Sequence, residues 1–208
     1  MEDLIEIRAK VNNKLELDLV RECAPTLAGL KTANLFNYQF ESIDSMNKEL
    51  LKMNSLLNEK GVYLQVLRIS TTRALLYVYR PMRLLKDLLN DKTLNTLKKD
   101  GYHVDLDNLD DRCDALVICN KFIRTLINRI EMEDSFPHEI GFFLGYPRED
   151  VIGFIEQKGQ NCKCCGFWKV YDNEERSKAI FAKYKKCFKI YQKVFLDGRT
   201  LSQLTVGA

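Results

Sequence analysis

Apolar side chains recur every three or four residues in four stretches of the chain, the spacing that places them on one face of an α-helix. These stretches cover residues 4–19, 43–57, 109–130 and 181–195. We expect the first helix to end near Glu22, because Pro25 disfavours helical geometry in the residue before it and has no amide hydrogen. Ser42 is a suitable cap for the second helix, and Gly61 lies just past its end.

Two further stretches, 62–69 and 74–79, are rich in β-branched, aromatic and leucine residues and predict strands. The short polar segment 70–73 between them favours an antiparallel hairpin. A third strand is predicted over 166–171, and we expect it to join the hairpin. Residues 26–36 are interpreted as a loop or a short turn of helix.

Prolines predict the start of three more helices, since a missing amide hydrogen costs nothing in a first helical turn; they are Pro81, Pro137 and Pro147. The pattern therefore indicates the α+β class, a mostly helical single domain over 1–208 packed on a small antiparallel sheet. The alternative division separates a helix-plus-hairpin half, 1–105, from a second helical half, 106–208.

Charge and hydropathy bear on location and partners. The apolar runs fall far short of the roughly 20 residues that cross a bilayer, and the first ten residues resemble no signal peptide. We expect a cytoplasmic protein with no membrane partner. A formal net charge of +3, from 32 basic and 29 acidic residues, gives no strong attraction for nucleic acid. The last helix is interpreted as an aromatic core stripe with a solvated face of lysines, in preference to a nucleic-acid face, and the oligomeric state stays open.

The chain has seven cysteines, an odd number. In a reducing cytosol we expect free thiols and no structural disulfide. Three cysteines lie on apolar helix faces and are expected to be inert core thiols: Cys113, Cys119 and Cys187.

Four segments of the chain are distinctive: 23–36, 75–80, 136–147 and 166–171. The third reads Phe-Pro-His-Glu-Ile-Gly-Phe-Phe-Leu-Gly-Tyr-Pro, and the fourth reads Gly-Phe-Trp-Lys-Val-Tyr. With these segments in this order, the chain resembles an uncharacterised family of clostridial proteins known only as a domain of unknown function. The resemblance covers most of the chain and implies a cytosolic protein of an anaerobic bacterium. It implies no activity, cofactor or catalytic residue.

Residues 135–171 concentrate scarce residue types, with one of the two histidines, the only tryptophan and three of the cysteines. His138 stands beside Glu139 at a predicted helix start, where exposed amide hydrogens disfavour a protonated imidazole. A neutral His138 would serve there as a base. The alternative is that His138 packs locally and Glu139 only complements the helix dipole.

Aromatic side chains of this region either belong to the core or line a pocket; they are Tyr146, Trp168 and Tyr171. Three cations would hold an anionic group of a ligand there: Lys31, Arg148 and Lys169. The spacing of Cys162, Cys164 and Cys165 matches structural zinc sites poorly, because those use pairs of ligands two to four residues apart. We predict no metal, and the sequence leaves the cofactor unknown.

Three hypotheses of function follow, and the sequence leaves open whether the protein is an enzyme. The first is a binding or accessory protein whose pocket near His138, Tyr146 and Trp168 accepts a small molecule, anionic or neutral. The second is a thiol enzyme with Cys23 as the nucleophile and His138 as its base, which requires the two to meet in the fold. The third is a structural or interaction module without a ligand site.

Overall fold

The computed structural model describes residues 14–103, 115–132 and 136–207. They form two compact units. The first contains the described residues up to Tyr79 together with those from Ala182 onward, and the second contains the residues between them. The single-domain organisation over 1–208 stays a prediction.

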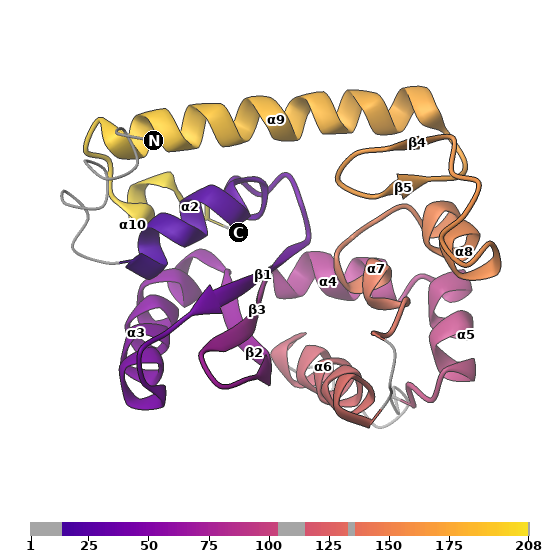
Figure 1. Cartoon of the computed structure of the whole chain (residues 1–208), viewed down its shortest axis with the longest axis horizontal. Coiled ribbons are helices and arrows are strands. Elements are labelled where there is room, and N and C mark those ends of the chain that lie inside the picture. Colours follow the sequence, from indigo (N-terminus) through magenta and orange to yellow (C-terminus); the bar gives the residue numbers. More distant parts are fainter. Residues whose placement is uncertain (1–13, 104–114, 133–135, 208) are drawn as a thin grey trace. The chain divides into compact units, whose positions relative to one another are not determined.

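The first unit is built from three helices, a short 3₁₀ turn and three strands (Figure 1). In chain order these are α2 (Lys14–Leu27), β1 (Ala33–Gln39), α3 (Ile43–Leu57), η1 (Asn58–Lys60), β2 (Tyr63–Ile69), β3 (Arg73–Tyr79) and α10 (Leu201–Leu204). The long helix α9 (Glu174–Leu196) begins in the second unit and continues into the first. The second unit otherwise contains α4 (Pro81–Leu88), α5 (Asp91–Lys99), α6 (Ala115–Met132), α7 (Ile140–Phe143), α8 (Arg148–Glu156), β4 (Cys164–Cys165) and β5 (Lys169–Val170).

The sheet of the first unit has the strand order β1-β3-β2, and both pairs are antiparallel. The hairpin of β2 and β3 is confirmed. The predicted segment 166–171 contains the short strand β5, but its predicted pairing with the hairpin is wrong, because β5 pairs with β4 in a separate two-stranded sheet. The third strand of the sheet is β1. Its first four residues belong to the segment 26–36, which was expected to be a loop or a short turn of helix. Its side chains alternate, with Phe36 and Tyr38 buried and Asn37 and Gln39 exposed, which is the period of a half-buried strand. The α+β class is confirmed.

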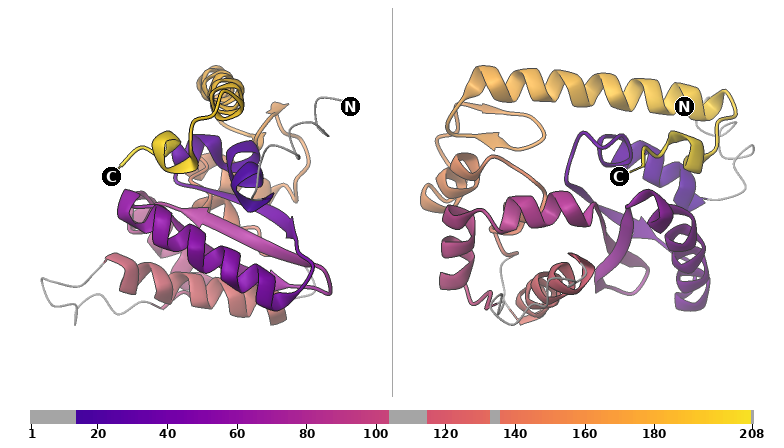
Figure 2. Two further views of the ribbon diagram at one scale, coloured as in Figure 1. Left: turned by 90° about the vertical axis from the view of Figure 1, so that its left-hand side faces the viewer. Right: turned by 180° about the vertical axis from the view of Figure 1, so that it is seen from behind.

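Helices α2 and α3 pack on this sheet and share one apolar core with it (Figure 2). The prediction for α3 is confirmed in detail, since the Ser42 side chain accepts a hydrogen bond from the Ser45 amide at 3.1 Å. The core side of α3 buries Met46, Leu50 and Met53. A capped helix with one apolar face is thus encoded locally, and packing completes it.

Helix α2 does not end near Glu22, as the position of Pro25 predicted, but continues to Leu27. Pro25 lies in the last turn, where its missing amide hydrogen removes a single helical bond. Cys23 and Leu27 of this turn are completely buried, so tertiary packing outweighs the local preference. The residues of the predicted helix before position 14 lie outside the described ranges.

The C-terminal segment returns to the first unit. Leu201 and Leu204 of α10 enter its core, and the Val206 amide donates to the Leu27 carbonyl at 3.0 Å. The apolar face predicted over 181–195 is confirmed, because Phe181 and Tyr184 are buried and Tyr191 and Phe195 pack against the core of the first unit.

In the second unit, α4 packs against α6 and α7. The buried Tyr102 ring lies 6.4 Å from Phe122 and 5.6 Å from Phe143, measured between ring centroids. Helix α6 buries the predicted apolar face, including Cys119 and Leu126, whereas Cys113 lies outside the described residues. None of the described helices combines the length and the hydropathy that crossing a membrane requires.

Candidate functional site

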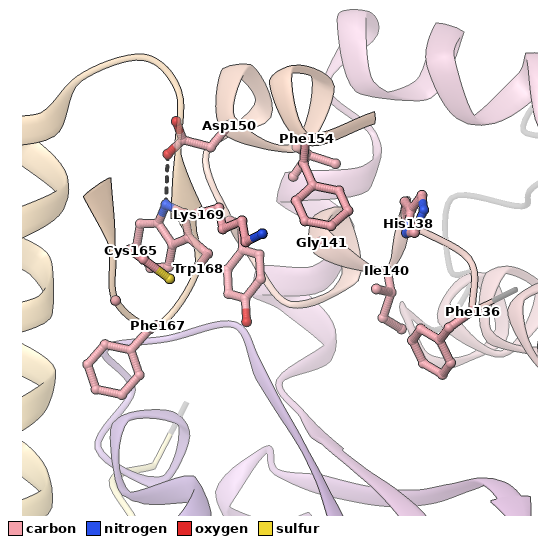
Figure 3. A pocket seen from close by; sticks show the side chains of 13 residues that line it. Phe136, His138, Ile140, Gly141, Asp150, Phe154, Cys165, Phe167, Trp168 and Lys169 are labelled. Atoms are coloured by element: carbon pink, nitrogen blue, oxygen red, sulfur yellow. Dashed lines mark hydrogen bonds between the residues drawn. The ribbon is translucent and has the colours of Figure 1, made fainter. Parts of the chain in front are cut away.

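A cavity of about 400 Å³ opens within the second unit (Figure 3). Its volume is within the range of small-molecule sites. One part of its wall comes from the segment before and within α7 and from α8, and the other comes from the β4–β5 hairpin. Most lining side chains are apolar or aromatic: Phe136, Ile140, Tyr146, Val151, Phe154, Phe167 and Trp168.

The α7 and α8 wall depends on a close approach at Gly141. A Cβ atom at this position would lie only 2.7 Å from a methyl carbon of Val151. Gly145 then turns the chain with a φ of 69°, in the left-handed region that glycine adopts without strain. The two glycines therefore let the Tyr146 ring reach the cavity from the turn between the helices.

The opposite wall is built around Trp168. Its indole stacks on the Tyr146 ring with centroids 5.0 Å apart and meets the Phe181 ring edge-on at 4.5 Å. A Cβ on Gly166 would lie 2.3 Å from the Phe181 ring, so only glycine permits this hairpin to sit on α9. Two alternatives were predicted for Trp168, the core and a pocket wall. Both describe its position, because the side chain is buried and also lines the cavity.

Asp150 holds the two walls together. The Trp168 indole nitrogen donates to its Oδ2 atom at 2.7 Å, and the amides of Tyr171 and Asp172 donate to Oδ1 at 2.7 and 2.9 Å. Asp150 is only 3% exposed, and these three donors compensate the burial of its carboxylate. Sequence reasoning missed this residue. The available signal was an acidic side chain in the first turn after Pro147, which is equally typical of a helix start.

His138 and Glu139 diverge in the structure. The exposed His138 ring lines the cavity and meets the Phe154 ring edge-on, with centroids 5.0 Å apart. Glu139 is buried elsewhere and accepts hydrogen bonds from the Tyr102 hydroxyl at 3.0 Å and from Arg129 Nε at 2.5 Å. Its bonds therefore anchor the segment that carries His138. Burial and the Glu139 carboxylate raise the pKa of Tyr102.

Lys169 brings a positive charge to the cavity wall. Its ammonium donates to the Gly159 carbonyl at 2.7 Å and lies 5.8 Å from the centroid of the Phe154 ring. Among the described residues, no carboxylate forms a salt bridge with it. An ammonium group has three donors, so bonds remain available to an anion in the cavity.

Residues 19–205 match the model of a family described as "Protein of unknown function (DUF3793)". The chain belongs to this family. The match spans all four distinctive segments, and the resemblance to a domain of unknown function is confirmed. No curated protein and no solved structure matches the chain.

Two other residues predicted to bind a ligand in this DUF3793 chain lie beside the cavity without lining it. The Arg148 Nε atom and the Tyr171 hydroxyl are buried and have no hydrogen-bond partner among the described residues. Tyr171 packs against α8, where a Cβ on Gly153 would come within 2.5 Å of it. Their role in binding a ligand stays a prediction.

The predicted residues Lys31 and Cys23 belong to the first unit. The Lys31 ammonium donates to the Ala33 carbonyl at 2.5 Å, and burial lowers its pKa to about 7. The predicted helix end near Glu22 would leave Cys23 just past the helix, but Cys23 lies inside α2 and its side chain is completely buried. Burial raises the pKa of the Cys23 thiol well above its usual value, although Lys31 opposes the shift. Its approach to His138 stays a prediction.

The cysteine-rich hairpin contributes one thiol to the site. Cys165 is exposed and lines the cavity near Trp168 (Figure 3). In the ranges that the structure describes, no three histidine, cysteine or acidic side chains gather as ligands of a metal ion would. All six described cysteines are free thiols.

Proposed function

We propose that this DUF3793 protein binds a small molecule with an apolar, aromatic body and an anionic group in the cavity near His138, Tyr146 and Trp168. The observation that carries the proposal is the cavity itself, about 400 Å³ of space with an aromatic wall. Lys169 adds a positive charge that no described carboxylate pairs in a salt bridge.

The aromatic wall supports an apolar body for the ligand. Burying apolar surface contributes about 25 cal/mol per Å². Rings stacked or edge-on at the wall gain about 0.5–1.5 kcal/mol per pair beyond burial. The rings of Tyr146, Phe154 and Phe167 stand at different places around the cavity, so a flat ligand has several surfaces to contact.

The charge distribution supports an anionic group near Lys169 and away from Asp150. The Asp150 carboxylate is occupied by three donors of the protein and contributes no donor to a ligand. Lys169 has donors to spare, and His138 adds an imidazole at another part of the wall. A carboxylate, sulfonate or phosphate therefore fits the polar end of the site.

The only tryptophan of the chain stacks in this wall, which makes its fluorescence a reporter of binding. We would titrate the protein with 8-anilino-1-naphthalenesulfonate, an aromatic anion, and with uncharged N-phenyl-1-naphthylamine. Both should quench Trp168, and the anion should bind about three- to tenfold more tightly, as expected for one partly exposed charge pair.

The substitution Lys169→Met should remove the preference for the anion and leave binding of the uncharged compound unchanged. Lys99→Met is the matched control, because Lys99 is an exposed lysine of the same unit that does not line the cavity. Equal affinity of the native protein for the two compounds, or no binding of either, would contradict the proposal.

We further infer that the protein works in the cytoplasm. The six described free thiols support this location, because oxidising compartments pair cysteines in disulfides.

A further inference from the structure

Helix α9 holds a disproportionate share of the basic residues. It contains seven of the 32 lysines and arginines of the chain but only two of its 29 acidic residues, Glu174 and Glu175 in the first turn. The rest of the chain has a slight acidic excess. We define the lysine face of α9 as the five lysines of its part in the first unit: Lys183, Lys185, Lys186, Lys189 and Lys193.

All five residues of the lysine face are exposed. At about 100° per residue, they cover an arc of roughly 160° around the helix. The other side of α9 is already occupied within the protein, since Tyr184 and Cys187 are buried and Tyr191 packs on the core of the first unit. The helix therefore presents its charge outward while its apolar side serves the fold.

The positive charge of this face is mostly uncompensated. Lys178, outside this face, pairs with Glu174 at 2.5 Å, whereas no salt bridge to a described carboxylate involves the five lysines of the lysine face. Lys185, Lys189 and Lys193 follow each other at four-residue spacing, and like charges at that spacing destabilise a helix. A polyanionic partner would relieve this repulsion on binding.

We propose that the lysine face of α9 binds the phosphate backbone of a nucleic-acid duplex. This reverses the expectation from net charge alone, because the overall charge of +3 averages away the concentration of lysines on one helix. A duplex carries one negative charge per about 1.7 Å of its axis, a linear charge density that a row of lysines along a helix complements.

The geometry favours a duplex over an anionic membrane. Helices that lie on membranes bury a continuous apolar face among the lipids, whereas Tyr184 and Cys187 of α9 are buried within the protein, which leaves Ile190 and Leu196 as its exposed large apolar side chains. A flat bilayer meets only the middle of a 160° arc. The major groove admits an α-helix between two phosphate strands, so lysines on both flanks reach phosphates. The exposed Ala182 lies between them around the helix and permits close approach.

The chemistry indicates binding without sequence preference. Lysines act as flexible point charges toward phosphates, while base recognition uses bidentate arginine, asparagine or glutamine side chains. Gln192 is the one exposed amide of α9. We therefore expect dissociation constants within the range of non-specific complexes, about 10⁻⁴ to 10⁻⁶ M at physiological salt.

The test uses the full chain and a fluorescent 20-base-pair duplex of mixed sequence, followed by anisotropy between 50 and 200 mM salt. The native protein should show a slope of log K against log salt of about −4 to −5, since each neutralised phosphate contributes about −0.9. Replacing Lys185, Lys186, Lys189 and Lys193 by glutamine should flatten the slope by about 3 to 4. Glutamine keeps good helix propensity, and circular dichroism checks the fold.

The control replaces four exposed lysines outside α9 by glutamine, which changes the net charge equally: Lys48, Lys92, Lys98 and Lys99. This variant should keep the native slope. The proposal is overturned if the native protein shows no salt-dependent binding of the duplex, if both variants lose affinity equally, or if vesicles of phosphatidylcholine and phosphatidylserine are bound while the duplex is not.

Discussion

Two buried carboxylates of the second unit, Asp150 and Glu139, organise the region around the cavity in different ways. Asp150 lines the cavity and accepts only from neutral groups, an indole and two backbone amides. Glu139 does not line it and is paired with the cation Arg129 and with Tyr102. The first carboxylate shapes the wall that a ligand touches, whereas the second fixes the chain segment that carries His138.

The two carboxylates also differ in how far water reaches the groups that bind them. Asp150 and its partner Trp168 are both buried, whereas 26% of the Arg129 side chain is exposed. Water can therefore screen the Glu139 pair in part, and it cannot replace the bonds of Asp150. The two sites should respond differently to substitution.

The largest effect is expected for Asp150→Ala, which leaves the indole and two amide donors without their acceptor. Unsatisfied buried donors cost about 1–3 kcal/mol each. Allowing for relaxation, the free energy of unfolding should fall by about 3 to 5 kcal/mol, as measured by urea unfolding followed by circular dichroism. Asp150→Asn keeps one acceptor and should lose about half as much. A loss below about 1 kcal/mol for the alanine variant would show that Asp150 does not hold the walls together.

Glu139→Gln should lower the free energy of unfolding by less, about 2 kcal/mol, because the Arg129 charge that loses its partner is partly solvated. The double variant with Arg129→Gln should be more stable than the sum of the single losses predicts, since neither charge then lacks its partner. Strict additivity in this cycle, measured by the same urea unfolding, would show that Glu139 and Arg129 do not stabilise the fold as a pair.

A pH titration of stability tests the Glu139 cluster through Tyr102. Its pKa is raised in the folded state, so the unfolded chain releases the phenolic proton first as pH rises. The stability that depends on neutral Tyr102 is present below about pH 10, the usual tyrosine pKa, and falls above it. Burial likewise raises the pKa of Tyr146 to about 12 on the Asp150 side. In urea unfolding between pH 9 and 11, Tyr102→Phe should show a shallower decline than the native protein, and an unchanged decline would argue against the Glu139 cluster.

Thiol labelling gives the smallest expected effect and reports on the Asp150 side of the cavity. Cys165 is exposed there and should react quickly with iodoacetamide, whereas the buried Cys23, Cys119 and Cys187 should react slowly. Burial raises the pKa of Cys187 to about 11, which lowers its thiolate fraction further. A saturating aromatic anion should slow Cys165 alone by a few fold. Rapid labelling of Cys23 by mass spectrometry would instead restore the thiol-enzyme hypothesis.

The helices and the hairpin were predictable because their signals are local. The 3-4 spacing from Met46 to Leu57 and the cap at Ser42 needed no distant partner. The failures came where tertiary packing decided the outcome. Pro25 stays helical because the surrounding turn is buried, and Lys169–Val170 is too short a strand to reveal its partner β4.

The site was predictable only in part, for the same reason. The crowding of rare residues led to His138, Tyr146, Trp168 and Lys169, all of which line the cavity. The predicted cation Lys31 and the predicted nucleophile Cys23 come from outside that region and lie in the other unit, and Asp150 was missed. Composition identifies unusual side chains, but the direction in which each one points depends on contacts between distant segments.

The most direct test of a ligand site at Trp168 is two-dimensional NMR of the ¹⁵N-labelled protein, because a chain with a single tryptophan gives a single indole N–H signal. On addition of 8-anilino-1-naphthalenesulfonate, we expect the Trp168 indole signal and the amide signals of Phe154 and Lys169 to shift together and to saturate. The amides of the β2–β3 hairpin in the first unit should stay in place. Saturating shifts in that hairpin with an unmoved indole signal would contradict a ligand site at Trp168.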